Sequence, residues 1–140
     1  MNKKMTAIKK IVTRQVFITR EFICIVCPNS CRLTVTENDG KITVSGNECP
    51  RGEKHGIHEY REPTRMLTTT VAINGGILPR LPVISAGEIP KARIRDCLEV
   101  LYKMKLNAPL RCGDIIAKNI CDTGVDVVAS RSMYRKEVYA

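Results

Sequence analysis

The stretch Cys24-Ile-Val-Cys27-Pro-Asn-Ser-Cys31, followed after a gap by Cys49-Pro-Arg-Gly52, decides how the first part of this chain folds. The four cysteines have the spacing C-x2-C-x3-C-x17-C. Three thiols in one short loop and a distant fourth are typical of a tetrahedral metal ion or of an iron–sulfur cluster, whose common ligand set is four cysteines. The spacing therefore predicts a metal centre held by Cys24, Cys27, Cys31 and Cys49.

The cysteine spacing predicts the ligands more directly than it predicts which metal they bind. Zinc ribbons usually supply two C-x2-C pairs, whereas this chain has one such pair, a third cysteine and a separate Cys-Pro. The three-plus-one pattern is closer to that of cluster ferredoxins and favours a [4Fe–4S] cluster. The alternative is structural zinc in a binding module for protein or nucleic-acid partners, and a metal-free thiol switch is a third interpretation. Beside the ligands, Arg51 would stabilise the more negative reduced state, and Gly52 would let the backbone lie close to the cluster.

A β-hairpin is predicted between the third and fourth cysteines. Residues 32–37 and 41–46 alternate apolar and hydroxyl side chains, and Asn38-Asp39-Gly40 separates the two runs. Antiparallel pairing of these strands would return the chain beside Cys31 and so deliver Cys49 to the other ligands. A short helix is expected to follow, beginning at Pro50 and ending near Tyr60.

The remainder of the chain predicts antiparallel strands and one main helix. Residues 65–73 are rich in β-branched side chains, and residues 77–85 would return as an edge strand because they contain Pro79 and Pro82. From Pro90 to Lys105 apolar residues recur at helical spacing, with Cys97 on the apolar face as a core residue. Residues 113–120 are ambiguous, and residues 125–129 indicate a final buried strand.

The expected fold class is therefore α+β, with a small four-cysteine cluster module and its hairpin followed by a small α+β domain. Only 4% of the residues are aromatic and none is Trp, so the core should be aliphatic. We expect a basic, disordered extension over residues 1–21, the cluster-binding module over 22–62 and the α+β domain over 63–140. A metal would add stability to so small a core.

Charge and cysteine usage limit the classes of function. The net charge is +9, and residues 1–21 contain six basic residues and one acidic residue. A clustered basic stripe with interleaved aromatics is missing after that segment, which makes a nucleic-acid partner unlikely on sequence grounds. We find no secretory signal and no membrane span in the pattern, and seven cysteines make an odd number for a disulfide framework. The sequence thus predicts a protein of a reducing cytoplasm.

No recognised catalytic constellation stands out, neither a Ser-His-Asp set nor a phosphate-binding or dinucleotide-binding glycine motif. His55 and His58 follow Cys49 but are not needed as ligands, because four cysteines already complete a set. Cys112 and Cys121 do not have the spacing of a second metal site. An enzyme that acts alone is therefore not expected.

The cysteine run and Cys49-Pro-Arg51-Gly52 resemble the [4Fe–4S] segment that opens molybdopterin oxidoreductases, where a C-x-[Lys/Arg]-Gly element follows three cysteines. The gap is shorter here, and the large molybdenum-binding part of those enzymes is absent from this sequence, so no molybdenum site is implied.

A broader resemblance covers nearly everything after residue 21. The chain is similar to a small CxxC-motif-containing family of unknown function, through Arg65-Met-Leu-Thr-Thr-Thr-Val71, Leu81-Pro-Val83, Ala108-Pro109, Gly113-Asp114 and Thr123-Gly124 as well as the cysteine motifs. Members of that family tend to be encoded beside an anaerobic glycerol-3-phosphate dehydrogenase and a second FAD/NAD-dependent oxidoreductase. The resemblance implies a non-catalytic electron-transfer subunit with a flavoprotein dehydrogenase or FAD/NAD-dependent oxidoreductase as its partner. The basic extension departs from the family pattern.

Overall fold

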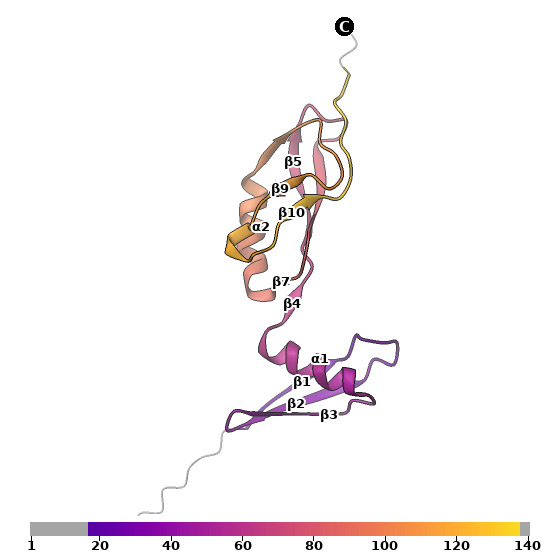
Figure 1. Cartoon of the computed structure of the whole chain (residues 1–140), viewed down its shortest axis with the longest axis vertical. Helices are drawn as coiled ribbons and strands as arrows, with labels where there is room; N and C mark the ends of the chain where they lie inside the picture. The colour runs from indigo at the N-terminus through magenta and orange to yellow at the C-terminus, as the bar shows by residue number, and fades with distance from the viewer. Residues whose placement is uncertain (1–16, 138–140) are drawn as a thin grey trace, which may run out of the picture. The chain divides into compact units, whose positions relative to one another are not determined.

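The computed structural model describes residues 17–137, which divide into two compact units at the boundary between Arg61 and Glu62 (Figure 1). We call them the N-terminal unit and the C-terminal unit. The sequence prediction placed this boundary one residue later. Both units contain a helix packed with antiparallel strands, so the predicted α+β class is confirmed.

The N-terminal unit is a three-stranded antiparallel sheet in the order β1-β2-β3 with one helix beside it (Figure 1). Its elements are β1 (Ile18–Ile23), β2 (Arg32–Asn38), β3 (Lys41–Ser45) and α1 (Pro50–Arg61). Leu33 and Val35 are fully buried on β2. A Cβ atom at Gly56 of α1 would lie only 3.1 Å from Cγ1 of Val44, so this glycine allows the helix to approach the sheet closely.

The predicted hairpin is confirmed in position and register. Strands β2 and β3 pair from Thr34 opposite Ser45 to Asn38 opposite Lys41. The connecting Asp39 and Gly40 both have positive φ angles, 49° and 80°, as a two-residue hairpin turn with right-handed strand twist requires. The helix beginning at Pro50 is also confirmed, and Pro50 loses nothing there because the first N–H of a helix has no partner within the helix.

Strand β1 corrects the expectation of an extension over residues 1–21. Residues 1–16 lie outside the described part of the chain, but Ile18 to Glu21 belong to a strand that pairs with β2 over its whole length. The pairing sets Phe22 opposite the buried Leu33. The guanidinium of Arg20 lies 5.5 Å from the centre of the Tyr60 ring on α1. A basic side chain at this point therefore packs on the fold through a cation–π contact.

The C-terminal unit is built on a five-stranded sheet in the order β8-β5-β6-β10-β9, with a separate two-stranded pair β4-β7. Its strands are β4 (Thr64–Arg65), β5 (Thr68–Asn74), β6 (Arg80–Ser85), β7 (Ile89–Pro90), β8 (Lys105–Asn107), β9 (Ile115–Ala117) and β10 (Val127–Ala129). The buried final strand expected over 125–129 is β10. The ambiguous stretch 113–120 contains the edge strand β9.

The prediction that Pro79 and Pro82 place their strand at a sheet edge is wrong, because β6 lies between β5 and β10. The residues of β6 that oppose β10 run from Val83 to Ser85 and so follow both prolines. The carbonyl oxygen of Pro82 accepts a hydrogen bond from the Ser130 N–H at 3.0 Å. The missing N–H of Pro82 therefore leaves the short ladder with β10 intact.

One helix completes the core of the C-terminal unit. The predicted helix between Pro90 and Lys105 consists of a 3₁₀ turn, η1 (Lys91–Arg93), and α2 (Ile94–Lys103). Cys97 and Leu101 of α2 are fully buried in a cluster with residues of β5, β6 and β10, as the apolar helical spacing predicts. In the part of the chain that the structure describes, no helix is both long and apolar enough to cross a membrane.

Candidate metal centre

The three clustered cysteines lie in the loop between β1 and β2. Cys24 directly follows β1, and its backbone N–H donates to the carbonyl oxygen of Cys31 at 2.9 Å, which closes the loop at the end of the sheet. Within it, the N–H of Ser30 is 3.4 Å from the carbonyl oxygen of Cys27, and Ser30 takes a left-handed conformation with φ 51°. The sheet thus supports a compact turn that carries all three thiols.

Burial differs among these thiols. Cys24 is buried, Cys27, Cys31 and Cys49 are partly exposed, and none of the four takes part in a disulfide. Beside the loop lie three exposed apolar side chains, Ile23, Ile25 and Val26, of which Ile25 is 75% exposed. The cysteine loop therefore has one buried thiol and, at its start, two exposed apolar side chains, Ile25 and Val26.

The fourth cysteine immediately precedes α1 and is held by the first turn of that helix. Backbone N–H groups of Gly52 and then Arg51 hydrogen-bond to the Cys49 thiol and lower its pKa, and the Arg51 side chain adds a hydrogen bond and a positive charge, against a smaller opposing effect of burial. Free N–H groups at a helix start favour negative charge. The thiolate, which is the form that binds a metal, is thereby favoured at Cys49.

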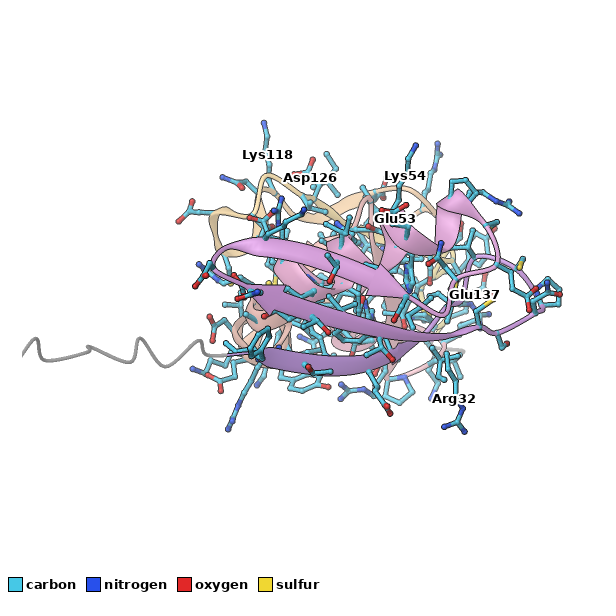
Figure 2. All side chains as sticks on the ribbon, turned by 90° about the horizontal axis from the view of Figure 1, so that it is seen from below. Arg32, Glu53, Lys54, Lys118, Asp126 and Glu137 are labelled. Carbon is cyan, nitrogen blue, oxygen red and sulfur yellow. The ribbon has the colours of Figure 1, made fainter. Side chains whose placement is uncertain are left out.

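Gly52 connects the start of α1 with the cysteine loop. A Cβ atom at this position would lie 3.7 Å from Sγ of Cys24 and 3.0 Å from Cβ of Asn47. Gly52 is buried, whereas Glu53 and Lys54, the next residues on α1, are exposed and their side chains point outward (Figure 2). The first turn of α1 therefore approaches Cys24 at Gly52, where a larger residue would contact the sulfur, and it follows Cys49 directly.

Two side-chain amides add to this connection. Nδ2 of Asn29, in the cysteine loop, donates to Oε2 of Glu48 at 3.0 Å. Nδ2 of Asn47 donates to the carbonyl oxygen of Cys49 at 3.1 Å. The first contact joins the loop of residues 24–31 to the segment that ends at Cys49, and the second holds that segment locally. Of the residues involved, Asn47 and Glu48 were missed by sequence reasoning, because no local pattern marks either of them.

The four thiols are not arranged around a point in space. Among residues 17–137, no group of three or more His, Cys, Asp or Glu side chains is positioned to hold a metal ion. What the fold brings together is the two halves of the predicted set, through Gly52 and the pair Asn29 and Glu48. The donor chemistry nonetheless suits a thiolate-ligated metal, since four cysteines with backbone N–H donors at one of the sulfurs form a ligand set for zinc or an iron–sulfur cluster.

The other candidate ligands are two histidines of α1 and three cysteines of the C-terminal unit. His55 and His58 lie further along α1 than Gly52, and both were left out of the predicted site. Cys97, Cys112 and Cys121 all belong to the C-terminal unit. Cys97 is confirmed as a core residue, and Cys112 is exposed.

The family model described as "Protein of unknown function (DUF1667)" matches residues 50–131. This match begins directly after Cys49, so the four cysteines precede it. No curated protein matches the chain. The chain is similar to an NMR structure of a Clostridium perfringens protein, with a TM-score of 0.49 and 22% sequence identity over 55% of this chain and 92% of that chain. Because the family model spans more than half of the sequence, the chain belongs to the DUF1667 family of proteins of unknown function.

Proposed function

We propose that this protein is an iron–sulfur electron-transfer subunit, or accessory protein, of a flavin-dependent oxidoreductase complex in a reducing cytoplasm. Cys24, Cys27, Cys31 and Cys49 would hold one [4Fe–4S] cluster. The observation that supports this most directly is the first turn of α1, where a Cβ atom at Gly52 would contact Sγ of Cys24, while the N–H groups of Gly52 and Arg51 lower the pKa of Cys49. One helix start thus links the buried ligand of the loop to the distant ligand.

The chemistry of the residues suits electron transfer. When bound, a [4Fe–4S] cluster exchanges single electrons at a potential set by its environment. The N–H donors at Cys49 draw negative charge from its sulfur, and the guanidinium of Arg51 favours the state with more negative charge. The exposed apolar residues Ile23, Ile25 and Val26 would let a flavoprotein approach closely beside the loop. We propose anaerobic oxidation of glycerol-3-phosphate as the reaction that this oxidoreductase complex carries out.

Metal analysis of the full chain purified without oxygen tests the cofactor. We expect a brown protein with about four iron and four sulfide per chain, whose visible absorbance falls on addition of dithionite. Cys49→Ser should lose most of the iron, whereas Cys112→Ser, which changes an exposed cysteine of the C-terminal unit, should retain it. A colourless protein with one zinc per chain would instead establish a structural metal module, the alternative function, and thiols that titrate without any metal would contradict both.

The role of Arg51 is tested by the reduction potential of the loaded protein. Arg51→Gln should lower that potential, because a positive charge next to the sulfur of Cys49 is lost. Lys54→Gln removes an exposed charge from the same helix and should shift it much less. Equal shifts in the two variants would show that Arg51 acts only through the overall charge.

The partner is tested by anoxic purification from the native host followed by measurement of flavin and iron in each fraction. We expect the two to elute together and the flavin, once reduced by its own substrate, to reduce the iron–sulfur protein. If the protein carries iron but exchanges no electrons with any co-purified flavoprotein, the proposed partner is wrong. The proposed cluster would still stand.

A further inference from the structure

Two further cysteines meet in the C-terminal unit, outside the candidate metal centre. Cys97 lies on α2 and is fully buried, and Cys121 lies in the 3₁₀ turn η2 (Ile120–Asp122), where it is partly exposed. The Cys121 thiol is near enough to raise the pKa of Cys97. Cys121 also packs against the hydrophobic core that contains Cys97. The two thiols therefore form a pair in which Cys97 is buried and Cys121 is partly exposed to solvent.

The backbone at η2 has an uncommon conformation. Asn119, Cys121 and Asp122 all have left-handed φ angles, 43°, 49° and 55°. Such angles are unfavourable for residues other than glycine, and they persist only where surrounding contacts impose them. The left-handed conformation at Cys121 forms a kink within η2.

Several contacts hold that kink in place. The guanidinium of Arg93 on η1 donates to the carbonyl oxygen of Cys121 at 2.7 Å. The side-chain oxygen of Asn119 accepts the N–H of Gly124, and the carboxylate of Asp126 accepts the N–H of Asn119, both at 2.7 Å. Ile120, directly before Cys121, is buried in the core. The turn is thus fixed on both sides, with Cys121 kept against Cys97.

We propose that Cys97 and Cys121 form a redox-active dithiol, which low-molecular-weight disulfides oxidise reversibly to an intramolecular disulfide. The Cys121 thiolate attacks one sulfur of the small disulfide, forms a mixed disulfide and releases one small thiolate. The Cys97 thiolate then attacks Sγ of Cys121, so that the Cys97–Cys121 bond forms and the second small thiolate leaves. Two electrons and two protons pass from the protein thiols to the small thiols, and the same steps run in reverse under excess small thiol.

The order of attack follows from exposure and from the electrostatics of the pair. Cys121 is reached from solvent, whereas Cys97 is closed off by the core. Burial and then the neighbouring Cys121 thiol raise the pKa of Cys97 in the reduced protein to about 11, with Arg93 lowering it and Asp96 raising it slightly. In the mixed disulfide the contributions of the free Cys121 thiol are gone, but burial still raises the pKa of Cys97, so the closing step should quicken as the pH rises, since the thiolate is the nucleophile. This site is independent of the proposed metal centre.

Peptide mapping of the full chain tests the proposal. The protein is incubated with glutathione disulfide, acid-quenched, blocked with N-ethylmaleimide and digested with trypsin. Residues 96–103 and 119–131 form tryptic peptides with one cysteine each. We expect these two peptides to appear as a disulfide-linked pair that disappears when reduced glutathione is added in excess. Both cysteines recovered as blocked thiols, or Cys97 recovered in a link with Cys112, would overturn the proposal.

Single-cysteine variants separate the two steps. In Cys97→Ala, Cys121 should accumulate as a glutathione mixed disulfide, because the resolving thiol is gone. In Cys121→Ala, Cys97 should stay unmodified, because it is not reached from solvent. Cys112→Ser is the matched control and should leave the linked pair unchanged. A wild-type protein in which Cys121 stops at the mixed disulfide, as in Cys97→Ala, would show that Cys97 does not resolve it.

Discussion

At the scale of single residues, the Cys97 thiol has a higher pKa in the folded protein than in the unfolded chain. Its pKa rises from an ordinary value of 9.0 to about 11, chiefly because the core desolvates the thiolate. The folded state therefore holds this proton more tightly than the unfolded state does. The resulting stabilisation is complete below pH 9 and is lost as the pH rises through 11.

We predict that the free energy of unfolding of the C-terminal unit falls by up to about 3 kcal/mol across that window, on top of the titration of other groups. Denaturant titrations at a series of pH values measure it. Cys97→Ala lacks the titrating thiol, so its stability should fall less steeply over the same pH range. Parallel curves for the wild type and the variant would contradict the assigned role of Cys97.

At the scale of elements, the end of the β2–β3 hairpin determines where the segment that leads to Cys49 starts. Gly46 follows β3 with φ 85°, and a Cβ atom there would lie 2.1 Å from the carbonyl oxygen of Arg32. Gly40 in the turn has a similar φ of 80°, but a Cβ atom there would meet nothing within 4 Å. The two glycines thus share a backbone conformation and differ in the space around them.

We predict that Gly46→Ala costs about 3 kcal/mol of stability in the N-terminal unit and reduces metal bound per chain, because the clash displaces the segment leading to Cys49. Gly40→Ala should cost about 1 kcal/mol, for the left-handed conformation alone, and retain the metal. Thermal unfolding and metal analysis of the two variants check this. Equal metal content in both would show that the position of Cys49 does not depend on the end of the hairpin.

At the scale of the whole molecule, apolar burial is divided unequally between the units. Within the described residues, the hydrophobic core cluster runs from Leu67 to Met133 and lies entirely in the C-terminal unit. The fully or nearly fully buried apolar side chains of the N-terminal unit are Cys24, Leu33 and Val35. So little buried apolar surface is typical of small folds that depend on a metal.

Metal removal should therefore unfold the N-terminal unit and spare the C-terminal unit. We expect chelator treatment, or Cys49→Ser, to make the region before Arg61 sensitive to limited proteolysis while a fragment beginning near Glu62 persists. The expressed fragment 62–140 should show the same unfolding midpoint as the later transition of the full chain. A single transition that shifts as a whole on metal removal would contradict this division.

Local sequence signals predict the elements whose conformation depends on neighbouring residues. Asp39-Gly40 supplies the positive φ angles of the hairpin turn, Pro50 begins α1, and the apolar spacing around Cys97 identifies the buried face of α2. Each of these follows from the conformational preferences of the residues themselves. The predicted ligands Cys24, Cys27, Cys31 and Cys49 depend likewise on spacing alone, and their binding of a metal stays a prediction.

By itself, then, the sequence determined the class of fold, the hairpin and the cysteine spacing of this DUF1667 family member, because those follow from short-range geometry. Only the tertiary structure decided that Ile18–Ile23 forms a strand on β2, that β6 is central despite Pro82, and that α1 approaches Cys24 at Gly52. It also decided that Cys97 meets Cys121. The physical reason is that each of these contacts joins segments distant in sequence, and such contacts depend on how the whole unit packs and satisfies its backbone hydrogen bonds.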